Sequence, residues 1–212
     1  MGLYLWVMYK TYMRPGECRG LLGCQLIPPT QAAGKAFGFW AILLHPTELG
    51  VPGKTNLFDE SLVWDTDPWA GELFNMLKSL SGEDGKIWPF DHDILLAIFQ
   101  LAARALRLDP LKPCLYAIRH GGASDDLLQK KGSFLEVKQR GRWAADNSLK
   151  RYGKMARALS ELAKVPTATI QFGREIGKLL PEILVGRSLV TPPPGFSQSV
   201  EFNDRMQELF RK

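Results

Sequence analysis

The sequence predicts an α+β fold that is mainly α-helical and carries one small β-sheet. Hydrophobic residues make up 45% of the 212 residues, which is enough for a core in one domain, or in one domain with an appendage. Three short apolar runs between residues 21 and 65 are bounded by Pro, Gly and polar residues, and they predict strands. From residue 93 onward, apolar residues recur at spacings of three and four, which predicts helices.

The first elements place a basic side chain at a joint between two helices. Residues 3–12 are apolar and helix-like, and Pro15 cannot lie inside that helix but suits the first turn of a new one. Glu17 is then favourably placed near the N-terminus of the second helix. Arg14 is therefore expected at the joint.

The strands are expected over residues 21–27, 37–44 and 61–65. Lys54 is expected to project from the turn between the second strand and the third.

Several helices are expected in the second half of the chain. Asp93 is expected to cap the first of them. The apolar face of that helix would consist of Ile94, Ala97, Ile98, Leu101, Ala102 and Ala105. Residues 116–124 lead into a second helix, and residues 134–139 form a third that ends at the break Gly141-Arg142-Trp143. Asp146 is expected to cap the next helix, in which Tyr152 would be a helical residue.

The domain organisation is expected to have three parts. They are a main domain over residues 1–160, a helical extension over residues 161–190 and a Pro-rich tail over residues 191–212. Within the extension, the helical pattern is expected to be interrupted at Pro181, because proline has no backbone N–H.

The net charge of +5 is unevenly distributed. Residues 101–160 hold 13 Lys and Arg against 5 Asp and Glu, whereas residues 1–100 hold 7 against 11. A basic segment within a nearly neutral protein is typical of a surface that binds a polyanion such as nucleic acid. A solvated helical face would explain the segment about as well.

Other classes of site are disfavoured. The three cysteines, Cys18, Cys24 and Cys114, form no CxxC pair and no closed set of disulfides. The cluster Asp91-His92-Asp93 is better explained by helix capping than by a metal site, because no other His or Cys accompanies it. The longest apolar run near the start, residues 2–9, is too short to span a bilayer, so an intracellular protein without membrane association is expected.

The order of four short motifs resembles the catalytic domain of the tyrosine recombinases, also called the phage integrase family. The motifs are Arg14 with Glu17, Lys54 in its turn, Arg119-His120 within residues 115–124, and Gly141-Arg142-Trp143 followed nine residues later by Tyr152. The resemblance covers about residues 3–160. It implies a small three-stranded antiparallel sheet and a DNA breaking and rejoining enzyme that works through a 3′-phosphotyrosine link.

The resemblance also implies a role for each site residue. Tyr152 would be the nucleophile, and Arg14 and Arg119 would bind two phosphate oxygens through their forks of N–H donors. Lys54 would protonate the departing 5′ oxygen, and Trp143 would donate its indole N–H or pack the helix of Tyr152. The implied reaction needs no metal, cofactor or ATP.

One position departs from the family pattern. Tyr116 stands where the family usually has His, three residues before the second arginine, and tyrosine is a poorer proton shuttle near neutral pH. Glu17 and His120 would support the two arginines.

Double-stranded DNA is the expected partner, and several molecules of the chain are expected to assemble on it. The protein is expected to be located with the DNA, which means in the nucleus if the source is eukaryotic. The DNA backbone would be contacted by Lys130, Lys131, Lys138, Arg140, Arg142, Lys150 and Arg151.

Two alternatives remain beside DNA recombination or integration. One is a catalytically impaired, DNA-binding remnant of a mobile-element integrase, because of Tyr116 and because only 13 residues precede Arg14, too few for a separate DNA-clamping domain. The other is a type IB topoisomerase, which shares the nucleophile and the arginines but exchanges no strands between partners.

Overall fold

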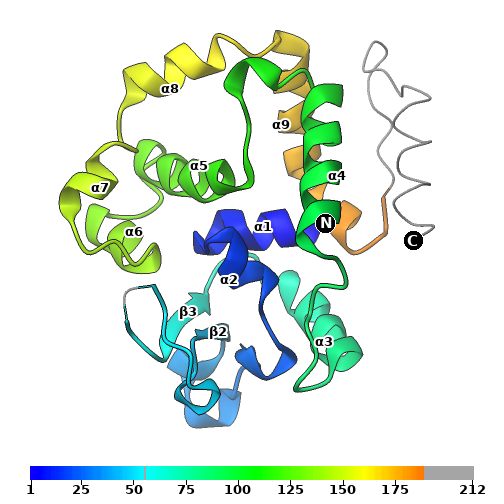
Figure 1. Cartoon of the computed structure of the whole chain (residues 1–212), viewed down its shortest axis with the longest axis vertical. Coiled ribbons are helices and arrows are strands. Elements are labelled where there is room, and N and C mark those ends of the chain that lie inside the picture. Colours follow the sequence, from blue (N-terminus) through cyan, green and yellow to red (C-terminus); the bar gives the residue numbers. More distant parts are fainter. Residues whose placement is uncertain (55, 189–212) are drawn as a thin grey trace. The chain divides into compact units, whose positions relative to one another are not determined.

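The computed structural model describes residues 1–54 and 56–188 (Figure 1). These residues form two compact units. One unit combines Met1–Tyr12 with the chain from Phe90 onward, and the other is Met13–Pro89. The predicted tail, residues 191–212, lies outside the described residues, and the predicted limits at 160 and 190 stay predictions.

The unit Met13–Pro89 contains the sheet. Strands β1 (Leu26–Ile27), β2 (Trp40–Leu44) and β3 (Glu60–Trp64) pair antiparallel in that order, and Trp40 lies opposite Trp64. The α+β class with a small three-stranded antiparallel sheet is therefore confirmed. The first strand is shorter than predicted because Gly23–Gln25 form a 3₁₀ turn, and Gly23 approaches the chain so closely that a Cβ there would lie 1.8 Å from the Gly82 carbonyl oxygen.

One face of the sheet carries the core of this unit. Trp40, Ile42 and Leu44 alternate along β2 as buried residues, as expected for a half-buried strand. Helix α3 (Ala70–Ser81) places Phe74 against this face, with ring centroids 5.6 Å from Trp40 and 5.0 Å from Trp64. The remaining short elements of the unit are α2 (Pro15–Arg19), η1 (Gly23–Gln25), η2 (Gln31–Ala33), η3 (Lys35–Phe37) and η4 (Thr47–Leu49).

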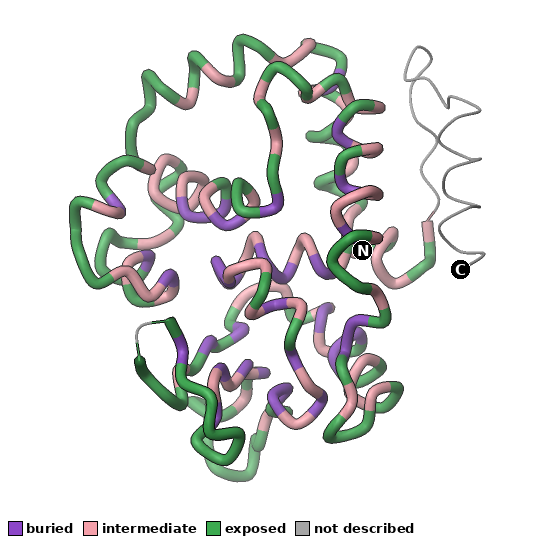
Figure 2. The backbone as a smooth tube through the Cα atoms, in the orientation of Figure 1, coloured by how far each residue is buried: buried purple, intermediate pink, exposed green. Residues whose placement is uncertain are grey.

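The other unit is helical throughout its described part. Its elements are α1 (Gly2–Thr11), α4 (His92–Ala105), η5 (Asp109–Leu111), α5 (Leu115–Leu128), α6 (Phe134–Arg140), α7 (Asp146–Lys150), α8 (Met155–Leu162) and α9 (Thr167–Leu184). Helices α1 and α5 pack at short range, because Gly122 has no side chain and a Cβ there would lie 2.0 Å from the Tyr9 carbonyl oxygen. Helix α8 has no buried residue (Figure 2).

Three details of these helices differ from the prediction. Asp91, not Asp93, caps α4, since its carboxylate accepts a hydrogen bond of 2.9 Å from the N–H of Ile94. The most buried stripe of α4 is Leu95, Phe99 and Ala103, one position away from the predicted apolar face. Helix α9 runs without interruption through Pro181, which falls in its last turn and leaves out only the hydrogen bond that an N–H there would donate to the Gly177 carbonyl.

No helix within residues 1–54 and 56–188 is long and apolar enough to cross a bilayer.

Candidate functional site

Arg119 is the most deeply buried charged residue of the candidate site. Helix α5 places it with only 1% of its surface exposed. Its Nη1 donates a hydrogen bond to the carbonyl of Tyr12, and its Nη2 donates to the carbonyl of Gly141. Tyr12 and Gly141 are the C-caps of α1 and α6. The guanidinium thus pairs carbonyls at two helix C-termini, where a positive charge is favourable.

Trp143 covers the guanidinium of Arg119. The guanidinium carbon lies 4.6 Å from the centroid of the Trp143 ring, a cation–π contact. The indole folds back over Gly141 so closely that a Cβ at position 141 would lie 1.7 Å from a ring carbon. The predicted pattern of glycine, one residue and tryptophan therefore has a steric reason in this fold.

Tyr152 lies beside Trp143, in a turn and not in a helix as predicted. Helix α7 ends at Lys150, and the Tyr152 N–H donates to the Leu149 carbonyl at 2.9 Å before α8 begins at Met155. Gly153 and the extended backbone of Lys154 separate the two helices, because glycine disfavours helix and Lys154 leaves helical geometry. The half-buried Tyr152 ring packs 5.5 Å from that of Trp143, against a cluster of buried residues. The cluster is Tyr12, Ala123, Val137 and Leu149.

The predicted cap of this helix also differs. Asp146 is the first residue of α7, Ala145 occupies the N-cap position, and no side chain caps the helix. The Asp146 carboxylate instead forms an ion pair with Lys138 of α6, which spans the break between the two helices. This ion pair lowers the pKa of Asp146.

Two further rings of α5 complete an aromatic row. His120 lies edge-on to Tyr152, with ring centroids 4.7 Å apart and planes 61° apart. Tyr116, one helical turn earlier on α5, packs against His120, with ring centroids 4.8 Å apart. Of the Tyr116 surface, 43% is exposed. The row therefore runs Tyr116, His120, Tyr152, Trp143, with Arg119 against its last member.

The electrostatics of the row favour uncharged side chains. Burial raises the pKa of Tyr152, whereas the charges of Arg151 and Arg119 lower it, and the net direction is upward. Burial, followed by the charges of Arg119 and Arg151, lowers the pKa of His120. At neutral pH, His120 is consequently a neutral imidazole and Tyr152 a protonated phenol.

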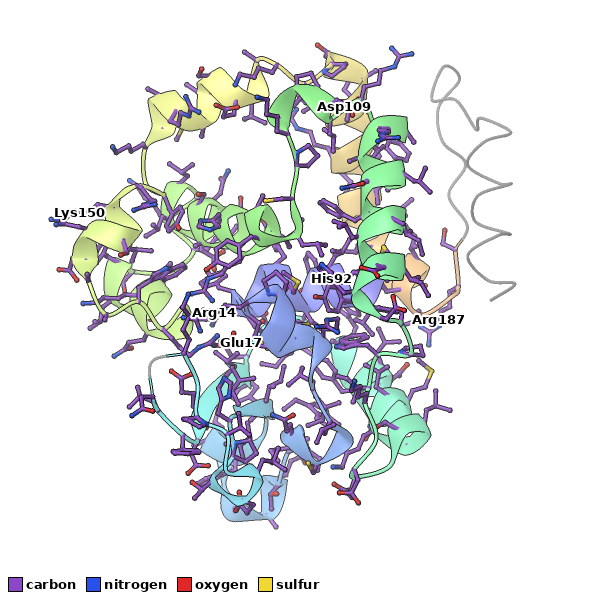
Figure 3. The ribbon with its side chains drawn as sticks, in the orientation of Figure 1. Arg14, Glu17, His92, Asp109, Lys150 and Arg187 are labelled. Carbon is purple, nitrogen blue, oxygen red and sulfur yellow. The ribbon has the colours of Figure 1, made fainter. Side chains whose placement is uncertain are left out.

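The other predicted basic and acidic site residues belong to the unit Met13–Pro89. Arg14 is the N-cap of α2, and Glu17 binds it twice, through an ion pair with the guanidinium and by accepting a 2.8 Å hydrogen bond from the Arg14 N–H (Figure 3). The Glu17 side chain is 8% exposed. The predicted joint between two helices, with Arg14 at it and Glu17 in the first turn, is confirmed.

Sequence reasoning missed His45, which lies beside this pair. It follows β2 with φ of 52°, and its Nε2 is 3.9 Å from Glu17 Oε1. Gly53 packs close to the same edge of the imidazole, where a Cβ would lie 3.0 Å from His45 Cδ2 and 3.2 Å from Nε2. Lys54 follows Gly53, exposed in the turn between β2 and β3, where it was predicted. The available signal was a histidine at the end of a predicted strand, which is weak by itself.

The basic residues predicted to contact DNA fall into two groups. Lys131 is paired with Asp125 at 2.6 Å, Lys138 with Asp146, and Arg140 donates to the Lys10 carbonyl at 3.5 Å. Arg142 is half-buried. Lys130, Lys150 and Arg151 are exposed, as is the paired Lys131, and the Lys150 side chain points away from the helices (Figure 3).

The described ranges contain no group of three His, Cys, Asp or Glu side chains that could hold a metal ion.

Comparison with protein-family models, with characterised proteins and with solved structures finds no match.

Proposed function

We propose that this chain cleaves and rejoins double-stranded DNA through a 3′-phosphotyrosine link at Tyr152, as a tyrosine recombinase does. One observation carries the proposal: the Tyr152 phenol is held between an imidazole and an indole, with the charges of Arg151 and Arg119 acting on it. A tyrosine in that setting has a neighbouring base and neighbouring cations, which are what a nucleophile toward a phosphodiester needs.

Each proposed role matches the chemistry of a side chain. Tyr152 attacks the phosphorus, and exposed cations near it, Arg151 and Lys150, bind the phosphate backbone. Arg14, oriented by Glu17, supplies a fork of donors for phosphate oxygens. The ammonium of Lys54 gives a proton to the departing 5′ oxygen. Further molecules of the chain assemble on the DNA for exchange of strands.

A second candidate function is DNA binding without cleavage, and the environment of Arg119 favours it. Arg119 is 1% exposed, and its two terminal nitrogens already donate to backbone carbonyls. Because the side chain is buried, a phosphate could reach the guanidinium only if the residues that cover it moved, and each carbonyl that lost its bond in the process would cost about 1–3 kcal/mol. Tyr116, a weak proton acceptor near neutral pH, points in the same direction.

Covalent trapping distinguishes the two functions. The probe is a pool of end-labelled, nicked duplexes with random sequence around the nick, because loss of the short leaving strand makes cleavage irreversible. The proposed function predicts an adduct that survives SDS and heating in the wild type and is absent in Tyr152→Phe, which should bind the same pool. Binding without any adduct would overturn the enzymatic proposal, and the appearance of adducts only in Tyr116→His would establish an impaired remnant.

Two further assays, joining of duplexes from the pool and relaxation of a supercoiled plasmid, separate recombination from topoisomerase activity. A recombinase assembly is expected to bring two duplexes together in a concentration-dependent manner. Relaxation of supercoiled DNA by single molecules, without joining of two duplexes, would identify a type IB topoisomerase instead.

A further inference from the structure

Attack by Tyr152 requires a group that removes the phenolic proton. An unperturbed tyrosine has a pKa of about 10, and burial raises that of Tyr152 further. The nearby charges of Arg151 and Arg119 oppose this shift without reversing it. The phenol is therefore protonated at neutral pH, and a proton acceptor must lie next to it.

Position 116, where the resemblance would place the usual histidine, does not supply that acceptor. Tyr116 is 43% exposed, and a neutral phenol accepts a proton poorly near neutral pH. Its ring contacts His120, at 4.8 Å between centroids. Tyr116 and His120 are four residues apart on α5 and therefore share one face of the helix.

His120 has the position and the protonation state that the task requires. Its ring centroid is 4.7 Å from that of Tyr152. Arg119, the preceding residue, is fixed by hydrogen bonds to two carbonyls, so the turn of α5 that bears His120 is fixed as well. A neutral imidazole has one ring nitrogen without a proton, and burial together with the charges of Arg119 and Arg151 keeps His120 neutral by lowering its pKa.

We infer that His120 is the proton acceptor for Tyr152 in the proposed strand cleavage, an inference that rests on the proposed function. As the bond from Tyr152 Oη to phosphorus forms, the Oη–H bond breaks and its proton passes to the unprotonated ring nitrogen of His120. The bond between phosphorus and the 5′ oxygen breaks, and that oxygen takes a proton from the general acid proposed above, Lys54. In the rejoining step, the 5′ hydroxyl gives its proton to the now neutral Lys54 amine as it attacks phosphorus, the bond between phosphorus and Tyr152 Oη breaks, and the imidazolium of His120 returns its proton to Oη.

The present contact between the two rings is edge-to-face and is not a hydrogen bond. The inference requires the Tyr152 side chain to rotate on binding DNA so that Oη meets the unprotonated imidazole nitrogen. Catalytic hydrogen bonds of this kind are often formed only in the complex with substrate.

The test compares the wild type with His120→Gln in single-turnover trapping on the nicked random-sequence pool. His92→Gln is the matched control, because His92 lies at the exposed start of α4 in the same unit (Figure 3). We expect His120→Gln to trap roughly 10²–10⁴-fold more slowly with unchanged affinity for the pool, and His92→Gln to match the wild type. In a second variant, His120→Ala, which leaves space for the free base, added imidazole should restore part of the lost rate.

The pH dependence of the rate, measured where thermal unfolding shows the chain still folded, gives a readout that a merely structural role would not move. The wild-type rate should fall as the pH drops through the pKa of His120, which burial and the charges of Arg119 and Arg151 hold below the ordinary value of about 6.5, because protonated imidazole cannot accept a proton. That decline should be absent in His120→Gln. If this variant fails to fold in a thermal unfolding assay, His120→Asn with added imidazole replaces it, and the acid decline of the wild type is still measurable.

Three results would overturn the inference. They are wild-type rates in His120→Gln, a slow variant that imidazole does not rescue, and a wild-type rate that does not decline at acid pH. A wild type that binds the pool but never forms an adduct would overturn the proposed function together with the inference. Failure of the proposed function is distinguishable from failure of the inference alone, because the wild type and Tyr152→Phe would then both bind the pool without forming an adduct.

Discussion

The guanidinium carbon of Arg119 lies 4.6 Å from the centre of the Trp143 ring, and this contact joins the anchoring of two helix ends to the placement of Tyr152. Arg119 holds the carbonyls of Tyr12 and Gly141, and Trp143 in turn packs 5.5 Å from Tyr152. A change at Arg119 should therefore affect both the stability of this unit and the position of the candidate nucleophile.

Replacement of Arg119 should destabilise the helical unit. Arg119→Met keeps a long apolar stem but leaves two carbonyls unpaired, at a cost of about 1–3 kcal/mol for each. Urea unfolding followed by circular dichroism measures the loss. Arg157→Met is the matched control, because that side chain is 72% exposed in an ion pair with Glu161, and it should change stability by less than about 1 kcal/mol. Equal effects of the two substitutions would show that the buried hydrogen bonds of Arg119 contribute nothing.

Addition of one methyl group at position 141 should displace Trp143. A Cβ at Gly141 would lie 1.7 Å from the indole, so Gly141→Ala must move the ring, with a cost of about 1–3 kcal/mol for overpacking. Tryptophan fluorescence and urea unfolding report the movement and the cost. Gly173→Ala in α9 meets no atom within 4 Å and should instead stabilise its helix by up to about 1 kcal/mol. Unchanged stability of Gly141→Ala would contradict the packing described.

The stability of the chain should depend on His120 at mildly acid pH. Burial lowers the pKa of His120 in the folded state, so the unfolded chain binds its proton first as the pH falls. The contribution of neutral His120 to the free energy of unfolding is complete above its pKa in the unfolded chain, about 6.5. It is lost as the pH falls from there through the lower pKa of His120 in the folded state. Urea unfolding of wild type and His120→Gln between pH 8 and pH 5 measures the difference. Parallel curves for the two proteins would contradict the shift.

The Arg14–Glu17 pair should contribute to the stability of the unit Met13–Pro89. Glu17→Gln can still accept the hydrogen bond from the Arg14 N–H but loses the charge that pairs the guanidinium. We expect a loss of about 1–3 kcal/mol in urea unfolding, because the carboxylate is only 8% exposed. Glu48→Gln, an exposed acid in the same unit, serves as the control and should be nearly neutral. A neutral Glu17→Gln would show that the ion pair makes no net contribution.

Exposed and paired lysines should differ in the salt dependence of DNA binding. Lys150 is exposed, whereas Lys131 is engaged by Asp125 at 2.6 Å. If Lys150 contacts one phosphate, Lys150→Gln should reduce the slope of log K against log salt by about 0.9. Lys131→Gln should change that slope less, because its charge is already partly neutralised. Fluorescence anisotropy with a random-sequence duplex provides the measurement, and identical slopes for all three proteins would exclude the Lys150 contact.

The sequence by itself determined the local elements and the order of the site residues. Pro15 and Glu17 define the start of α2, alternating apolar residues define β2 and β3, and the turn that carries Lys54 follows from Pro52-Gly53. These signals act within a few residues, through dihedral preferences, caps and periodicity.

Only the tertiary structure decided what surrounds the site residues. Arg119 is buried in contact with Tyr12 and Gly141, which lie 107 and 22 residues away in the sequence. No local sequence pattern encodes partners at such separations. Tyr152 lies in a turn, although a single helix through residue 159 satisfies the apolar spacing, because the chain bends at Gly153 to pack Tyr152 against His120 and Trp143. Periodicity records which side chains are apolar, whereas burial and hydrogen-bond partners depend on contacts between distant segments of the chain.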